Sequence, residues 1–159
     1  MKTAGLFAVC VTTVLLVGAC GVEANKNVAV PTNPNAESEI HDAVMAIKND
    51  IETSNIAGLQ DAHLKSEKFS KFGPRNFERQ DVASTNQSEA AFFSSISDAS
   101  YEVKDLKIDV FGEIGIATYY PEVSFVRNGE HIESSGRQTL VFLNTDAGWK
   151  LVHEHGTGR

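Results

Sequence analysis

The change of pattern near residue 100 is the feature that most constrains the fold of this chain. From Tyr101 onward the sequence is rich in Val, Ile, Tyr, Phe and Thr and contains stretches in which apolar and polar residues alternate, a pattern typical of half-buried strands. Asn128-Gly129 is the strongest turn signal, because a tight type I′ turn needs positive φ at both central residues. Together with Phe111-Gly112 and Asp146-Ala147-Gly148, it predicts four strands at about 101–110, 114–127, 131–144 and 149–155.

The residues before this region carry helical patterns. In "ESEIHDAVMAIKNDIETS", Ile40, Val44 and Ile47 recur at spacings of four and three, as on the buried face of an amphipathic helix. A shorter helix is predicted to begin at Asn55, and a third to occupy "NQSEAAFFSSI" behind an Asn86 cap. Helices followed by a meander predict an α+β domain, with three N-terminal helices packed on one face of a four-stranded antiparallel sheet.

The first twenty residues are predicted to be an export signal. A charged start at Lys2 precedes an apolar run that ends in "VGAC", and the run is too short for a typical membrane-spanning helix. "VGAC" also resembles the lipobox of bacterial lipoproteins, which implies cleavage after residue 19 and lipid attachment to Cys20. A secreted protein in which Cys10 and Cys20 only happen to lie near a cleavage site is the alternative.

This reading divides the chain into a signal peptide at 1–19, a lipidated cysteine and flexible tether at 20–36, and one domain at 37–159. We expect an exported protein that is lipid-anchored to the cell envelope. Gly21 is not the Asp that retains lipoproteins in the inner membrane, so the outer membrane is favoured in a cell that has one.

The charge balance argues against a nucleic acid partner. The net charge is -7 and the isoelectric point is near 5.2, whereas nucleic acids and anionic membrane surfaces attract clustered Lys and Arg. The length of 159 residues, 42% of them hydrophobic, suits one compact domain. We therefore expect no nucleic acid partner. Contact with the membrane is expected through the lipid anchor. We also expect no cofactor.

The order of elements resembles the cone-shaped fold of the nuclear transport factor 2-like superfamily, in particular its SnoaL-like branch. The supporting segments are "FSKFGP", "VKDLKIDVFGEIGIATYY" and "GRQTLVFLNTDAGWKLVHEHGTG". The last segment is also similar to the association domain of calcium/calmodulin-dependent kinase II, whose final strand carries a Trp and a His-x-His-x-Ser-Gly pattern. The resemblance implies a curved sheet around a conical pocket, and we expect a homodimer that forms through the sheet.

The resemblance also implies which residues line the pocket. The arginine positions of association domains fall on Tyr120, Leu140 and Gly156, none of which is basic, so a cavity for a small apolar molecule is expected. The even-numbered residues would then point inward, with Glu154 in the cavity and His153 and His155 outside, unless a bulge reverses the assignment. The expected ligand-binding residues are Tyr120, Leu140, Phe142, Val152 and Glu154.

The terminal histidines also suggest metal binding. His153 and His155 would lie on one face of a strand, but a catalytic zinc commonly has three protein ligands. We therefore expect hydrogen bonding at a sheet surface or a subunit interface, and no metal.

Acid/base chemistry remains the alternative to binding. The candidates for proton transfer are Glu154, His63 and Asp61, because burial in a pocket shifts the pKa of such groups toward the working pH. Since one fold of this kind supports many activities, a binding or assembly role is placed first, and an enzyme of the isomerase or dehydratase type second.

Overall fold

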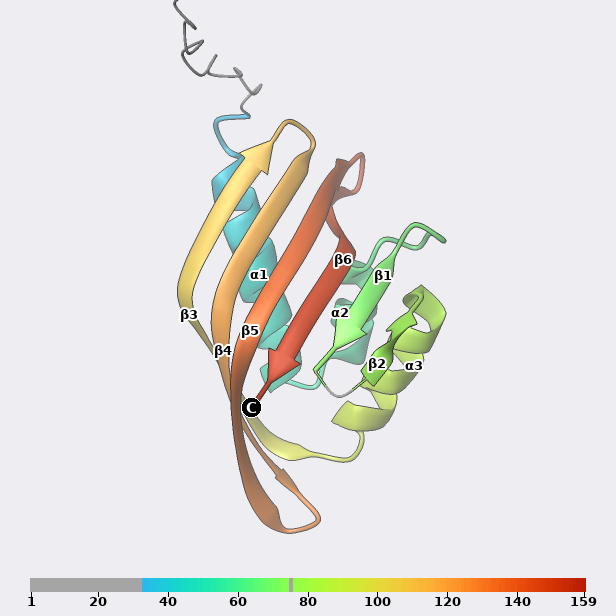
Figure 1. The fold of residues 1–159 in the computed structure, drawn as a ribbon, viewed down its shortest axis with the longest axis vertical. Helices are drawn as coiled ribbons and strands as arrows, with labels where there is room; N and C mark the ends of the chain where they lie inside the picture. The colour runs from blue at the N-terminus through green and yellow to red at the C-terminus, as the bar shows by residue number, and fades with distance from the viewer. Residues whose placement is uncertain (1–32, 75) are drawn as a thin grey trace, which may run out of the picture.

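The computed structural model describes residues 33–74 and 76–159, in which a six-stranded sheet is ordered β2-β1-β6-β5-β4-β3 (Figure 1). Helices α1 and α2 lie behind the sheet in this view, and α3 lies beside β2. The elements are α1 Ala36–Glu52, α2 Ile56–Ala62, β1 Ser70–Gly73, β2 Asn76–Gln80, α3 Val82–Phe93, β3 Ser97–Phe111, β4 Ile114–Arg127, β5 Glu130–Thr145 and β6 Gly148–Gly158.

The predicted signal peptide, Cys20 and most of the tether at 20–36 lie outside the described residues. Among the helices of the described part of the chain, none is both long enough and apolar enough to span a membrane.

The meander predicted for the second half is confirmed. Strands β3 to β6 pair in succession, and each pair is antiparallel. Asn128 and Gly129, which join β4 to β5, have φ angles of 54° and 80°, as a type I′ turn requires. Glycines with positive φ also occupy the other two turns, at Gly112 and Gly148.

The sheet has six strands, so the prediction of four is wrong. The two additional strands, β1 and β2, pair antiparallel with each other, and β1 pairs in parallel with β6 at Ser70↔His153 and Phe72↔His155. A strand of four residues is too short to show a clear alternating pattern. Its pairing depends on the edge of β6, which is distant in sequence.

The third helix begins earlier than predicted. Asp81 caps α3 with a side-chain bond from Ser84 N at 2.8 Å, and Ser84 Oγ accepts in return from Asp81 N at 3.0 Å. This reciprocal capping fixes the helix start at Val82. Asn86, the predicted cap, therefore lies inside the helix, and its side chain is directed to another partner.

Helix α1 covers part of one face of the sheet. Ile40 and Val44 are buried on its inner face, where they pack in one cluster with Phe142 and Leu151 of the sheet. Trp149 Nε1 donates a hydrogen bond of 2.8 Å to Glu39 Oε2 in the first turn of α1. The core thus lies between α1 and the sheet, and a hollow lies next to it on the same face, toward α2 and α3.

Candidate functional site

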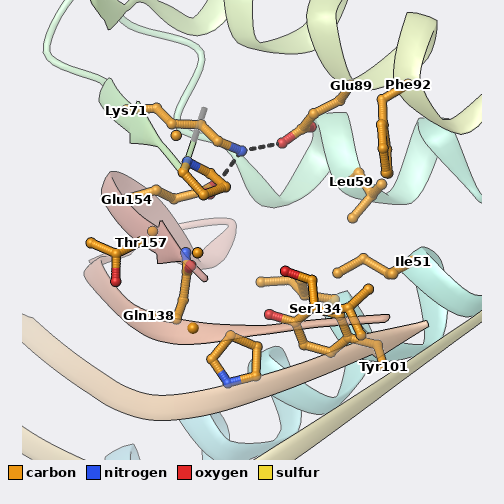
Figure 2. A pocket seen from close by; sticks show the side chains of 18 of the residues that line it. Ile51, Leu59, Lys71, Glu89, Phe92, Tyr101, Ser134, Gln138, Glu154 and Thr157 are labelled. Carbon is orange, nitrogen blue, oxygen red and sulfur yellow. Dashed lines mark hydrogen bonds and ion pairs between the residues drawn. The ribbon is translucent and has the colours of Figure 1, made fainter. Parts of the chain in front are cut away.

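A cavity of about 1010 Å³ lies between the helices and the inner face of the sheet (Figure 2). This volume is at the upper end of the range for small-molecule sites. Phe92 extends the aromatic wall by packing edge-on against Phe125, with ring centroids 5.3 Å apart. The main apolar lining residues are Ile51, Leu59, Phe92, Phe93, Tyr101 and Leu140.

One part of the cavity wall is charged. His63, Lys71, Glu89 and Glu154 all line the cavity, and we call these four residues the ion cluster. They come from the end of α2, from β1, from α3 and from β6. The cluster therefore forms only when these four segments are packed together.

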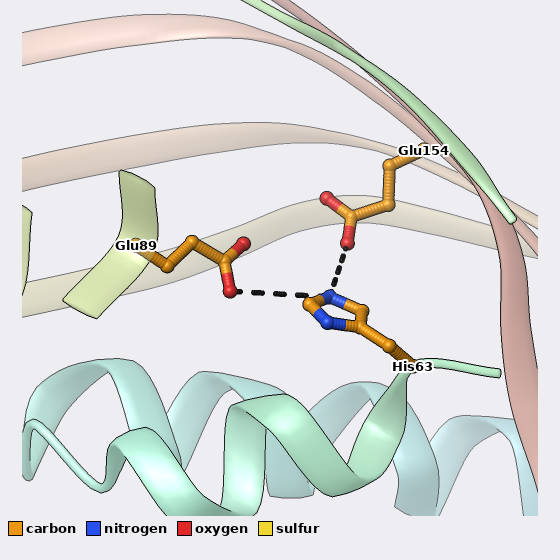
Figure 3. A group of neighbouring side chains, drawn as sticks. All are labelled: His63, Glu89 and Glu154. Atoms are coloured by element: carbon orange, nitrogen blue, oxygen red, sulfur yellow. Dashed lines mark hydrogen bonds and ion pairs between the residues drawn. The ribbon is translucent and has the colours of Figure 1, made fainter. Parts of the chain in front are cut away.

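His63 is held by acceptors at both ring nitrogens. Nε2 lies 3.0 Å from Glu154 Oε1 (Figure 3). Nδ1 lies 2.9 Å from Asn86 Oδ1. The ring also packs on Phe69, with centroids 4.8 Å apart. Since both partner atoms accept hydrogen bonds, both ring nitrogens donate, and His63 is an imidazolium in this arrangement.

The environment of His63 agrees with this charge state. Burial by itself would lower the pKa of His63, but the hydrogen bond to Glu154 and the charges of Glu154 and Glu89 outweigh burial and raise it. The side chain is 3% exposed. A histidine whose proton is held in this way can act as a general acid near neutral pH.

Lys71 bridges the two carboxylates. Its Nζ lies 2.5 Å from Glu89 Oε1 and 2.9 Å from Glu154 Oε2. Burial would lower the pKa of Lys71, but the two carboxylate charges raise it instead. Lys71 is thus a fixed cation, and not a neutral amine available as a nucleophile.

Glu154 connects the two cations. Burial would raise its pKa, yet the charge of Lys71 and the hydrogen bond from His63 lower the pKa of Glu154 to about 2. Glu154 is therefore a carboxylate held between Lys71 and His63.

Two tyrosines add hydroxyl groups to the cavity wall. Tyr101 Oη and Tyr119 Oη are 3.1 Å apart, and both residues line the cavity. Burial raises the pKa of Tyr101 to about 12 and raises the pKa of Tyr119 as well, so both hydroxyls stay protonated. Because one hydroxyl donates to the other, the second hydrogen remains for a bound molecule.

The ion cluster also has the residue types of a metal site. One ligand atom each from His63, Glu89 and Glu154 lies within 4.8 Å of the others, the single such group in the searched residues, 33–74 and 76–159. Lys71 already bonds both carboxylates, and its charge would repel a divalent cation at this position. The donor set therefore fits an ion-pair cluster better than a metal centre.

Only some of the predicted ligand-binding residues line the cavity. Leu140 and Glu154 line the cavity, whereas Phe142 lies in the core beneath α1. Tyr120 is 52% exposed, because β4 turns its odd-numbered residues inward. Val152 does not line the cavity, since a bulge opposite Val141 and Phe142 displaces it from the inward series.

The candidates Asp61, His153 and His155 do not line the cavity. Asp61 lies on the surface, where ion pairs with Lys150 and Lys65 at 2.9 and 3.1 Å lower its pKa. His153 and His155 lie away from the cavity, and His153 Nδ1 is 2.9 Å from Ser70 Oγ. Of the three proton-transfer candidates, the structure brings together His63 and Glu154.

The sequence analysis missed four groups of this site: Lys71, Glu89, Asn86 and the tyrosine pair. Asn86 and Glu89 are three residues apart and share a helix face, a spacing that was interpreted as a helix start. Lys71 is directly opposite Glu154 in the β1 and β6 register. That relationship cannot be derived without the parallel pairing.

The fold and the site define an α+β domain whose bent sheet and helices enclose a largely apolar cavity with buried acid/base groups. The chain belongs to the SnoaL-like domain family, which matches residues 40–157. The resemblance to the SnoaL-like branch is therefore confirmed. No curated protein sequence matches the chain.

Solved structures share this fold at low sequence identity. A protein proposed to be a dehydratase of the NTF2-like family, from Streptomyces avermitilis, is 16% identical, with a TM-score of 0.73 over 80% of this chain and 99% of that chain. An NTF2-like superfamily protein from Salmonella enterica is 19% identical, with a TM-score of 0.72 over 78% and 91%. A protein proposed to be an aromatic ring hydroxylase, from Novosphingobium aromaticivorans, is 17% identical, with a TM-score of 0.71 over 80% and 91%.

Proposed function

We propose that this domain binds a small, largely apolar molecule in the cavity, with the polar part of that molecule at the ion cluster. The observation that carries the proposal is a hollow of about 1010 Å³ with aliphatic and aromatic walls and one charged end. Apolar walls supply affinity, and a few fixed polar groups set orientation.

The test is binding of the apolar fluorophore N-phenylnaphthylamine, whose emission rises in an apolar site. The Ile51→Trp substitution fills part of the cavity and should weaken binding strongly. The Phe77→Trp variant adds the same side chain at a position that is 96% exposed and outside the lining, and it should bind like the wild type. Equal binding by both variants would place the dye elsewhere and count against the proposal.

An acid/base enzyme of the isomerase or dehydratase type is the second candidate. The observation that favours it is the His63 and Glu154 pair, which faces the cavity and holds a proton in a buried position. A dehydratase needs such a proton donor for the departing hydroxyl group, and a positioned acid or base contributes about a hundredfold or more to the rate.

Turnover separates the two candidates. The chain is incubated with small cyclic β-hydroxy ketones, and loss of water is followed by the absorbance of the conjugated product. The enzyme hypothesis expects the His63→Gln variant to lose about a hundredfold or more in rate while still binding the fluorophore. Turnover that is unchanged in this variant would remove His63 from the mechanism.

The predicted lipoprotein anchor is compatible with either function. We propose that Cys20 carries lipid and that the domain is held at the envelope membrane, on the support of the "VGAC" sequence after an apolar run. Cys20→Ala should move the protein from the membrane fraction to the soluble fraction. The same fractionation, with the two membranes separated, tests the outer-membrane location.

The proposed homodimer uses the outer face of the sheet. Tyr120 is 52% exposed on this face, and a large exposed aromatic side chain is typical of subunit contacts. If two copies pair here, Tyr120→Glu should convert the dimer to a monomer in light scattering of the purified domain. A wild-type protein that is monomeric at all concentrations would refute the proposal.

A further inference from the structure

The two tyrosine hydroxyls of the cavity wall form a pair with one proton to spare. Tyr101 Oη lies 3.1 Å from Tyr119 Oη, and this is the single hydrogen bond that either hydroxyl makes within the described part of the chain. Each tyrosine hydroxyl has one proton to donate. When one hydroxyl donates to the other, the proton of the receiving hydroxyl has no acceptor among the described residues.

The exposure of the two side chains sets the direction of this hydrogen bond. Tyr119 is 4% exposed, whereas Tyr101 is only partly buried, and Figure 2 shows Tyr101 across the hollow from Lys71 and Glu89. A polar proton that is buried without an acceptor costs more free energy than one that faces a hollow. The arrangement of lower free energy therefore has Tyr119 donating to Tyr101, whose own proton is directed to the cavity. Such a chain also strengthens the outer donor, because successive hydrogen bonds polarise one another.

From this arrangement we infer that the molecule bound in the cavity carries a carbonyl oxygen that accepts a hydrogen bond from Tyr101 Oη, with Tyr119 as the positioning residue behind it. A carbonyl oxygen accepts without bringing a proton that needs an acceptor of its own. The neighbour of Tyr101 on β4, Val123, is apolar and lines the cavity, so the rest of the molecule can be apolar here. The inference rests on the proposed binding function and adds a second polar contact to it.

The experiment compares two probes with one aromatic skeleton: acetylnaphthalene, and isopropenylnaphthalene, in which a methylene group replaces the carbonyl oxygen. Each probe displaces N-phenylnaphthylamine from the purified domain at neutral pH. The ratio of the two dissociation constants isolates the contact of the oxygen, because a change in the apolar walls or in stability affects both probes alike. Tyr101→Phe should shift this ratio about fivefold against acetylnaphthalene, as expected for one neutral hydrogen bond.

The other two tyrosines of the chain supply matched variants. Tyr119→Phe removes the donor behind Tyr101 but keeps the Tyr101 proton, so the ratio should shift less than in Tyr101→Phe. Tyr120→Phe removes the same hydroxyl group from a side chain that is 52% exposed and does not line the cavity. This control should leave the ratio of the wild type unchanged.

Infrared spectroscopy of bound acetylnaphthalene tests the contact directly. A hydrogen bond to a carbonyl oxygen lowers the stretching frequency of that carbonyl group. The bound probe should therefore absorb at lower frequency in the wild type and in Tyr120→Phe than in Tyr101→Phe. A purely structural role of Tyr101 would not produce this difference.

The outcomes are separable. Failure of N-phenylnaphthylamine and of both probes to bind would overturn the proposed function and this inference with it. If the fluorophore binds, the inference alone is overturned by a failure of acetylnaphthalene to bind or by a ratio that Tyr101→Phe does not change. A low carbonyl frequency that persists in Tyr101→Phe would also overturn it, and would assign the carbonyl to another donor such as the Lys71 ammonium. If Tyr101→Phe does not fold, as judged by circular dichroism, the wild type decides: a bound carbonyl that absorbs as it does in an apolar solvent would overturn the inference.

Discussion

His63 Nε2 lies 3.0 Å from Glu154 Oε1, although the two residues are 91 positions apart in the chain. This pair joins the end of α2 to a strand in the interior of the sheet. Both side chains are almost fully buried. The contact therefore links the two segments and also holds a proton between His63 and Glu154 at the cavity wall.

Replacing Glu154 by Gln tests the pair directly. The variant leaves two buried cations with one carboxylate, and we expect a loss on the order of 3 kcal/mol in the free energy of unfolding. The pKa of His63 should also fall, because Glu154 is the main group that raises it. Urea unfolding and an NMR titration of His63 measure the two effects. Glu130→Gln, at the exposed first residue of β5, is the control, and equal stabilities would contradict the expectation.

The alkaline side of the stability profile should depend on His63. The pKa of His63 is raised above its ordinary value of 6.5, so its contribution is complete below pH 6.5 and is lost as the pH rises through the raised value. The stability difference between wild type and His63→Gln should therefore shrink toward high pH. Urea unfolding at several pH values measures this, with exposed His41→Gln as the control. A difference independent of pH would show that His63 is not an imidazolium.

The stability of the domain at acidic pH should depend on Glu154. Its pKa is lowered from 4.5 to about 2, so its contribution is complete above pH 4.5 and is lost as the pH falls toward 2. The stability advantage of the wild type over Glu154→Gln should decline across this window. Thermal unfolding followed by circular dichroism at low pH is the measurement. An advantage that persists unchanged at pH 2 would argue against the buried ion pair.

The hydrogen bond between Trp149 and Glu39 should be visible in fluorescence. Trp149 is the single tryptophan of the sequence, and its indole nitrogen donates to the first turn of α1. Glu39→Ala should cost about 1 kcal/mol and change the Trp149 emission. Glu37→Ala removes a neighbouring exposed acid of the same turn and serves as the matched control. Identical spectra for the two variants would refute the contact.

The cap of α3 should contribute to the position of Glu89. Asp81→Ala removes the reciprocal bonds with Ser84, and the expected loss is about 1 kcal/mol in the free energy of unfolding. Asp81→Asn preserves an acceptor of similar capping strength and should recover most of this loss. Hydrogen exchange of the first α3 amides locates the effect. An effect of Asp81→Ala spread evenly over the domain would contradict a local cap.

The long strands and α1 were predictable because local pattern and final environment agree. Alternation along β4 and β5 places one side of each strand on the core, and Asn128-Gly129 provides the turn geometry that the hairpin needs. The apolar stripe of α1 likewise corresponds to the residues that the core buries, Ile40 and Val44.

The details of the site were less predictable because they depend on register. One bulge between β5 and β6 keeps Glu154 inward and removes Val152 from the series, while β4 follows the opposite parity and exposes Tyr120. Lys71 reaches the cavity through a parallel pairing of a very short strand. Such relationships are set by tertiary contacts, and no local pattern contains them.

The position of β6 has a consequence for how the domain assembles. This strand follows every other described element in the chain, yet it lies inside the sheet between β1 and β5. The β1 and β2 hairpin has no sheet to join, and Lys71 has no Glu154 to meet, until β6 has been synthesised. The charged part of the cavity wall is therefore completed only after β6 has been synthesised, although α1 and strands β3 to β5 can already pair with one another.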